Sequence, residues 1–223
     1  EDRDHWSRFM ESDLVAGWLE QIEAEAGITV IGDQTKMVRG PYRVMVTAKP
    51  VGGLEDISGL KLRMHPNELA AEAWRHLGAE VRTLAWTDVY ESIGRGIVEA
   101  VNSPIALVES MRFQEVAPHI VRHNEYPQGI AFMANAEAWN GLEEGTRAQI
   151  IEAYNAVAAE FAPMTAAIAD DAIARMTENG VTYDEIDTGP IVSKMAEFYA
   201  EKDAAGDLPD GFIATVRATQ ATQ

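Results

Sequence analysis

The sequence contains no cysteine. It therefore has no disulfide bonds, no thiol nucleophile and no cysteine-ligated zinc or iron–sulfur site. Positive charge is also scarce, because 18 lysines and arginines face 36 acidic residues, which gives a formal net charge of −18. Nucleic acids and anionic membrane surfaces bind basic patches, so this composition argues against both as partners. No apolar run approaches the length of a membrane span, and we expect no direct membrane insertion.

What is present is typical of a soluble globular protein. The 223 residues are 47% hydrophobic and 24% charged, which is enough chain for one large domain or two small lobes. The chain opens with Glu1-Asp2-Arg3-Asp4, without an initiator methionine or a signal peptide. We expect either that a targeting segment has been removed or that these residues are part of a longer chain.

The first half of the chain alternates between helical and strand-like patterns. A helix is expected over residues 7–26, followed by strands at 28–31 and 42–47. A β-α-β-α-β run is then expected at 60–64, 66–77, 80–84, 87–93 and 97–101. Such a run predicts a parallel sheet covered by helices, with its ligand at the carboxyl ends of the strands. This places Arg63, Met64, Asn102 and Ser103 at the functional edge.

The second half contains the longest periodic segment. Apolar residues recur at steps of four and three over residues 146–178, which predicts one long helix with a single apolar face: Ile150, Tyr154, Val157, Phe161, Met164, Ile168. A helix of this length spans on the order of 50 Å, so it would connect two lobes, with a kink at Pro163. Strands are expected at 129–133 and 181–186, and a last helix at 190–200.

Most combinations of reactive residues in the sequence favour structural roles. There is no nucleophile elbow and no phosphate-binding loop. Gly94-Arg95-Gly96 is interpreted as a helix terminator, and Asp170-Asp171 as solvated charge. His119 and His123 could share one side and hold a metal, but a plain surface pair is the simpler interpretation. We therefore expect no catalytic residue, no metal and no cofactor.

Two arginines on predicted strands are the remaining candidates. Arg43 lies in Gly40-Pro41-Tyr42-Arg43-Val44, and Arg63 ends the strand that follows Gly59. The planar guanidinium binds a carboxylate through two parallel hydrogen bonds and stays ionised when buried. The alternative is that either arginine is a surface residue or part of a structural ion pair.

A series of short motifs between Gly40 and Trp139 occurs in the order found in one protein family: Lys49-Pro50-Val51, Leu54-Glu55-Asp56-Ile57, Gly59-Leu60-Lys61-Leu62-Arg63, Leu77-Gly78-Ala79, Trp86-Thr87-Asp88-Val89-Tyr90, Gly96-Ile97-Val98-Glu99-Ala100, Phe113-Gln114-Glu115-Val116-Ala117 and Met133-Ala134-Asn135-Ala136. With these motifs the chain resembles the extracytoplasmic substrate-binding proteins of tripartite ATP-independent periplasmic (TRAP) transporters, the DctP-like family. The resemblance implies an α/β clamp of two lobes with mainly parallel sheets, joined by the long helix. The N-terminal part of the first lobe would be absent.

The resemblance also implies a function and a site. The clamp would close on a small organic acid in the periplasm and deliver it to a membrane permease. Arg63 would pair with the ligand carboxylate, and Arg43 would be a second pocket cation. The resemblance points more weakly to further pocket residues, which are Ser103, Asn102, Trp86, Tyr126 and Gln128.

The resemblance further suggests how the chain is divided. Residues 1–50 would hold the remainder of the first lobe and a crossover strand, and 51–145 the second lobe with a returning strand. Residues 146–180 would form the long helix, and 181–223 a C-terminal strand and helices. Two alternatives are a ligand-sensing binding domain with no transport partner and, with less support, a soluble hydrolase that uses an acidic pair.

Overall fold

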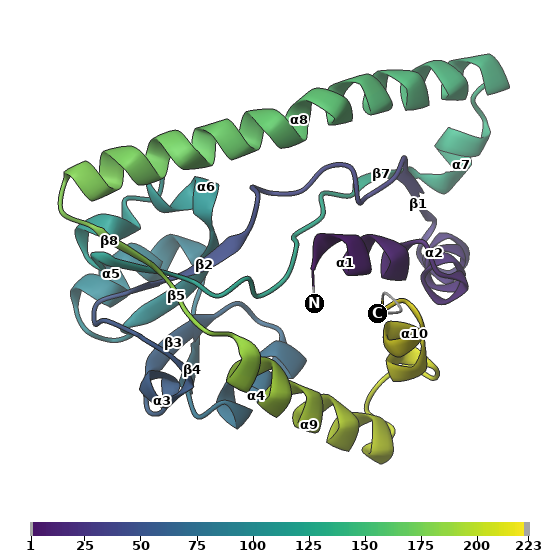
Figure 1. Cartoon of the computed structure of the whole chain (residues 1–223). Coiled ribbons are helices and arrows are strands. Elements are labelled where there is room, and N and C mark those ends of the chain that lie inside the picture. The colour runs from purple at the N-terminus through teal and green to yellow at the C-terminus, as the bar shows by residue number, and fades with distance from the viewer. Residues whose placement is uncertain (1, 221–223) are drawn as a thin grey trace.

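The structure is a computed structural model that describes residues 2–220. Its larger lobe is built on a six-stranded sheet (Figure 1). In spatial order the strands are β4 (Glu80–Thr83), β3 (Lys61–Met64), β5 (Ala100–Pro104), β2 (Arg43–Thr47), β6 (His119–Arg122) and β8 (Thr182–Glu185). β3 pairs in parallel with β4 and β5, and β6 pairs in parallel with β8. β2 runs antiparallel to both of its neighbours.

The predicted β-α-β-α-β run is confirmed, with one strand displaced. Helix α4 (Glu68–His76) connects β3 to β4, and a 3-10 turn with helix α5 (Val89–Gly94) connects β4 to β5. α5 ends at the predicted Gly94-Arg95-Gly96 terminator, where Gly96 adopts φ +68°. The backbone N–H groups of residues 97 and 98 bond back to Ser92, so the strand expected at 97–101 begins only at Ala100.

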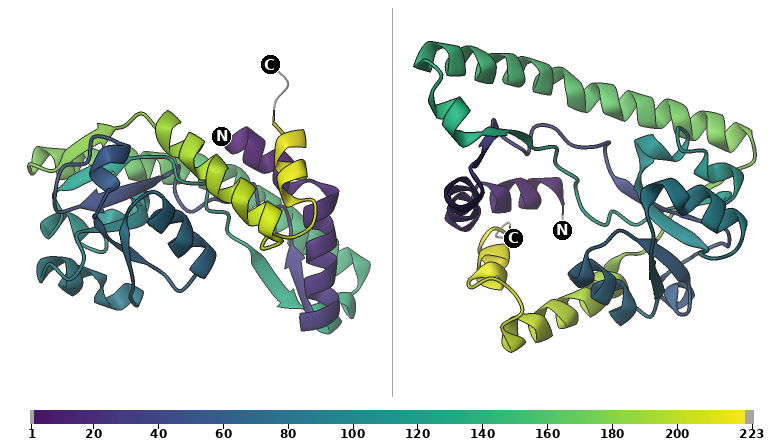
Figure 2. Two further views of the ribbon diagram at one scale, coloured as in Figure 1. Left: turned by 90° about the horizontal axis from the view of Figure 1, so that it is seen from below. Right: turned by 180° about the vertical axis from the view of Figure 1, so that it is seen from behind.

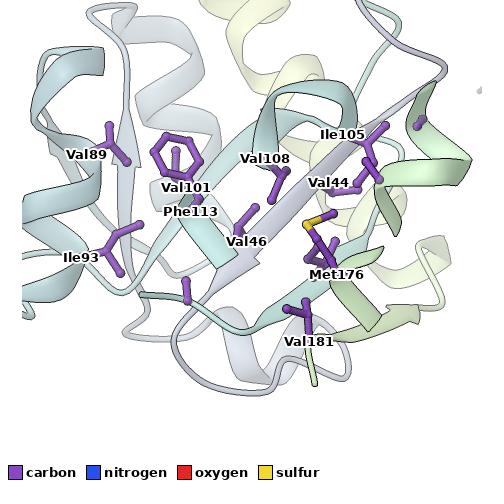
Figure 3. Packing of buried hydrophobic residues seen from close by; sticks show 14 of the residues in the cluster. Val44, Val46, Val89, Ile93, Val101, Ile105, Val108, Phe113, Met176 and Val181 are labelled. Atoms are coloured by element: carbon purple, nitrogen blue, oxygen red, sulfur yellow. The ribbon is translucent and has the colours of Figure 1, made fainter. Parts of the chain in front are cut away.

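Apolar side chains cover both faces of this sheet. On one face, α5, helix α6 (Ile105–Val108) and the C-terminal part of helix α8 (Glu144–Glu178) pack on the strands, as the close-up in Figure 3 shows for Val44, Val46, Phe113 and Met176. On the other face lie helix α3 (Leu54–Ile57), α4 and helix α9 (Gly189–Ala205). β2 lies inside the sheet and is covered on both faces, so it is buried along its whole length, and its three middle residues, Val44, Met45 and Val46, are apolar.

The smaller lobe lies at the other end of the molecule (Figures 1 and 2). Its elements are α1 (Arg3–Met10), α2 (Asp13–Ala26), α7 (Ala136–Asn140), α10 (Phe212–Ala218) and an antiparallel pair of strands, β1 (Ile28–Ile31) and β7 (Phe132–Asn135). The single helix predicted over residues 7–26 is wrong. Ser12 accepts a hydrogen bond from the backbone N–H of Val15 and starts a new helix there.

Helix α8 connects the two lobes, as predicted, and continues through Pro163 as one helix (Figure 1). Its predicted apolar face is wrong in part. Tyr154 is buried, but Ile150, Val157, Met164 and Ile168 are 38–57% exposed. The rest of the buried face consists of small residues and one methionine: Ala158, Thr165, Ala169, Ala172 and Met176. Small residues let the helix approach the lobes closely, which a count of large apolar residues does not reveal.

Within residues 2–220, the helices are all too short or too polar to cross a membrane.

Candidate ligand-binding site

The topology of the larger sheet brings the predicted site residues to one edge. β3 and β5 are parallel, so Arg63 and residues 102–104 lie at the same end. β2 enters the sheet at this end, where Arg43 faces Pro104 across the ladder. β6 also leaves the sheet there, since Arg122 pairs with Val44, and it carries the loop 123–128 to the same edge.

Arg63 is almost completely buried, with 6% of its surface exposed. Its Nε and Nη2 groups both donate to the carbonyl oxygen of Leu84, at 3.0 and 2.8 Å. Its guanidinium lies 5.2 Å from the centre of the Trp86 ring. Among the described residues no carboxylate pairs with Arg63. Its positive charge is therefore held in place by a backbone dipole and an aromatic face, and it is not neutralised.

Arg43 has a different environment. Its Nε donates to Glu125 Oε2 at 2.8 Å, and its Nη1 donates to Gln128 Oε1 at 2.6 Å. The ring of Tyr126 lies 4.6 Å from the guanidinium carbon. The Arg43 and Glu125 side chains are only 9% and 15% exposed, so this is a largely buried ion pair. The sequence left open that either strand arginine is part of a structural ion pair. Arg43 forms such a pair, and Arg63 does not.

Glu125 is the centre of a buried polar cluster. Its Oε1 accepts hydrogen bonds from Trp74 Nε1 at 2.9 Å and from Asn102 Nδ2 at 3.1 Å. We call Arg43, Glu125, Gln128, Trp74 and Asn102 the Glu125 cluster. Burial disfavours the ionised carboxylate, but the charge of Arg43 and the hydrogen bonds from Arg43 and Trp74 outweigh burial and lower the pKa of Glu125.

The two neighbouring candidates on β5 point in different directions. Asn102 belongs to the Glu125 cluster, and its Oδ1 is buried without a hydrogen-bond partner among the described residues. Ser103 is completely buried, and its hydroxyl donates to the carbonyl oxygen of Pro104. The structure thus joins Arg43, Asn102, Tyr126 and Gln128 in one group, sets Arg63 against Trp86, and leaves Ser103 on the core side of the strand.

Three residues of this edge were missed by the sequence analysis. Glu125 is one of 36 acidic residues, so its type gave no signal. Trp74 approaches from α4, far along the chain from its partner. His123 was interpreted as half of a surface pair, which is wrong: it is buried with its ring 5.7 Å from that of Trp74, and burial lowers its pKa.

The described part of the chain gathers no group of three metal-ligating side chains. His119, the other half of the predicted histidine pair, instead bonds to Thr182 Oγ1 at 2.9 Å.

A cavity of about 500 Å³ separates the two lobes next to this edge. Its walls come from α1 and α10 on one side and from residues 122–127 on the other. Glu125 and Tyr126 line it, so it reaches the Glu125 cluster directly. Arg63 and Trp86 lie outside the lining that residues 2–220 provide for this cavity. The Arg63 guanidinium is therefore not part of this cavity, which meets the edge of the sheet at Glu125 and Tyr126.

Comparisons with known proteins agree with this architecture. Residues 1–204 match the model of "Bacterial extracellular solute-binding protein, family 7", called DctP. The chain is 28% identical over 148 residues to the ectoine-binding periplasmic protein TeaA of Halomonas elongata, a match that covers 66% of this chain and 42% of that protein. It is 26% identical over 106 residues to the C4-dicarboxylate-binding periplasmic protein DctP of Rhodobacter capsulatus, which covers 48% of this chain and 32% of that one.

Solved structures show the same fold. A TRAP periplasmic solute-binding protein from Ochrobacterium anthropi with bound L-fuconate superposes with a TM-score of 0.83 at 18% identity, covering 98% of this chain and 70% of that one. The ectoine-binding protein of Halomonas elongata gives 0.82 at 20% identity, covering 98% and 72%. The chain matches less than half the length of the curated relatives named above and about 70% of these structures.

These relatives are named as periplasmic binding proteins, which supports a binding role over catalysis and confirms the predicted periplasmic localisation. The predicted two-lobed α/β fold is likewise confirmed. The family match spans most of the chain, and the chain therefore belongs to the DctP family of bacterial extracellular solute-binding proteins.

Proposed function

We propose that this chain is the solute-binding component of a TRAP-type transporter that captures a small organic acid. The ligand carboxylate binds Arg63, beside Trp86, at the edge of the six-stranded sheet. The loaded protein then delivers the acid to membrane permease subunits. This proposal extends to the chain what the named relatives do, namely bind ectoine, a C4-dicarboxylate or L-fuconate.

One observation carries the proposal. Arg63 holds a buried positive charge with no acidic partner among the described residues, although the chain as a whole has an excess of 18 negative charges. Burial, and to a smaller extent the charge of Arg43, lower the pKa of Arg63, but a guanidinium remains protonated at neutral pH. Its Nη1 group makes no hydrogen bond within residues 2–220. A ligand carboxylate would supply both the missing charge and the missing acceptor.

The geometry also gives a reason for the two bonds to Leu84. They fix the guanidinium plane before a ligand arrives, so less side-chain entropy is lost on binding. Trp86 is itself fixed, because its ring packs edge-on against the buried ring of Phe113 at 5.2 Å. Removal of the charge should therefore affect affinity more than it affects the fold.

Calorimetric titration with L-fuconate, D-glucuronate and ectoine tests this role. A charge-assisted hydrogen bond contributes about 1.5–3 kcal/mol, and stranding the buried charged partner costs about 3–5 kcal/mol, so Arg63→Ala should weaken binding by roughly one to three orders of magnitude. Arg63→Lys should also bind poorly, because the planar fork is lost. Arg82→Ala is the matched control, since Arg82 faces Arg63 across the β3–β4 ladder but is paired with Glu80 at the surface. Affinity that is unchanged in Arg63→Ala, or absence of binding to every acid, would overturn the proposal.

A further inference from the structure

The two lobes are connected on opposite sides of the molecule. α8 spans them on one side, and α9 followed by α10 spans them on the other (Figures 1 and 2). α9 packs on α4 of the larger lobe, and α10 lies against α1 of the smaller lobe. We call α9, α10 and the residues 206–211 between them the strap.

α9 is held firmly on the larger lobe. The ring of Phe198 is buried and lies 5.4 Å from the ring of His76 on α4. Lys202 Nζ bonds to Glu72 on α4 at 2.6 Å and to Asp207 at 3.0 Å. The lysine therefore also fixes the start of the connection to α10. Because this connection is short and held at its start, the strap has little slack while α10 is attached.

An aromatic side chain is the main anchor of α10 on the smaller lobe. The Phe212 ring packs edge-on against Phe9 of α1, with 5.6 Å between the ring centres, and stacks on Trp18 of α2 at 6.2 Å. Phe9 and Trp18 also contact each other at 6.3 Å, so the three rings form one group. Aromatic pairs of this kind stabilise a contact beyond the apolar area that they bury.

Hydrogen bonds to backbone carbonyl groups of α10 and its end add to this attachment. His5 Nε2 donates to the carbonyl oxygen of Val216 at 2.9 Å, and Arg8 Nε donates to that of Thr219 at 2.7 Å. Within residues 2–220 the chain reaches α10 from the larger lobe and does not continue into the strands of the smaller lobe. In this part of the chain the strap is thus attached to the smaller lobe by non-covalent contacts, which can break and form again, whereas α8 is covalently continuous with both lobes.

α10 also forms part of the wall of the inter-lobe cavity. Phe212 and Val216 line it from the smaller lobe, and Arg122 and Tyr126 line it from the larger one. We infer that the strap is a releasable restraint on lobe opening. Phe212 holds the lobes at a fixed separation on this side, and its release lets them rotate apart about the remaining connections and widens the cavity. The inference does not depend on Arg63 or on which acid binds.

Distances between the lobes test this inference. The chain has no native cysteine, so Glu25→Cys on α2 and Arg75→Cys on α4 provide two exposed sites for spin labels. Double electron–electron resonance then gives the distribution of distances between the lobes in the ligand-free protein. Phe212→Ala removes both ring contacts and should raise the population with longer distances by roughly tenfold. Arg8→Gln removes one hydrogen bond and should shift the distribution in the same direction by a smaller amount.

The matched control is Phe132→Ala. Phe132 lies in the same lobe and also packs edge-on against an aromatic ring, that of Tyr154 at 5.5 Å, but it is not part of the strap. This variant should keep the wild-type distribution. The inference is overturned if Phe212→Ala keeps it as well, or if Phe132→Ala changes it as much as Phe212→Ala does. If circular dichroism shows that Phe212→Ala does not fold, an unchanged distribution in Arg8→Gln overturns the inference instead.

Discussion

Glu125→Gln should destabilise the fold by several kcal/mol, although it changes few atoms. The amide can still accept hydrogen bonds from Trp74 and Asn102, so the main loss is the negative charge opposite Arg43. That arginine side chain is only 9% exposed and cannot be rehydrated without disrupting the edge. Breaking a buried ion pair by removing one partner costs about 3–5 kcal/mol.

A double-mutant cycle with Arg43→Met isolates the pairwise energy. Removing both charges leaves neither stranded, so the double variant should be clearly more stable than the two single changes predict when added together, with a coupling on the order of 3 kcal/mol. The matched control is Glu91–Arg95, an i,i+4 pair on α5 whose side chains are 70% and 67% exposed. Its coupling should be about 0.3–0.5 kcal/mol. Urea unfolding followed by circular dichroism measures both cycles. Equal coupling in the two pairs would refute the assignment of Arg43 and Glu125 as a buried, mutually neutralising pair.

Three further predictions follow from the structure. Because burial lowers the pKa of His123, the unfolded chain takes up more protons than the native one as the pH falls below about 6.5, and the free energy of unfolding should decrease there. His123→Phe should remove this pH dependence, whereas the control His65→Gln should keep it. The same slope in His123→Phe as in the wild-type chain would contradict the prediction. Gly32→Ala should lower the melting temperature, because a Cβ atom at φ +73° would lie 2.5 Å from a packed aromatic ring, whereas Gly17→Ala in open space within α2 should raise stability by about 0.5–1 kcal/mol; a similar effect of both would be inconsistent with the packing described. Pro163→Ala should restore a backbone donor inside α8 and stabilise the protein by up to about 3 kcal/mol in thermal unfolding, and an unchanged or lower stability would show that the helix tolerates this proline without cost.

The sequence was sufficient for the architecture because periodicity and turn residues act locally. The β-α-β-α-β run, its terminator at Gly94-Arg95-Gly96 and the long helix were all readable from spacing. Boundaries depended on tertiary bonds, as in the late start of β5. The apolar face of α8 was predicted wrongly because three alanines and a threonine are among its buried residues, while four of the larger apolar residues are exposed.

Only part of the candidate site could be predicted from the sequence, for a related reason. Arg43 and Arg63 could be singled out as strand arginines, but their different states depend on a partner from elsewhere in the chain. Glu125 neutralises one of them, and the backbone carbonyl of Leu84 holds the other. Every residue has a backbone carbonyl, so the sequence does not show that the carbonyl of Leu84 binds Arg63. Glu125 is one of 36 acidic residues, so its residue type does not single it out.

The most direct test of the whole account is the affinity of the wild-type chain and of Arg63→Ala for one hydroxylated monoacid, D-gluconate or L-fuconate, measured by calorimetry in the same buffer. The account predicts measurable binding to the wild-type chain and a loss of about tenfold to a thousandfold in the variant, with the fold retained. Equal affinity in the two proteins would contradict it.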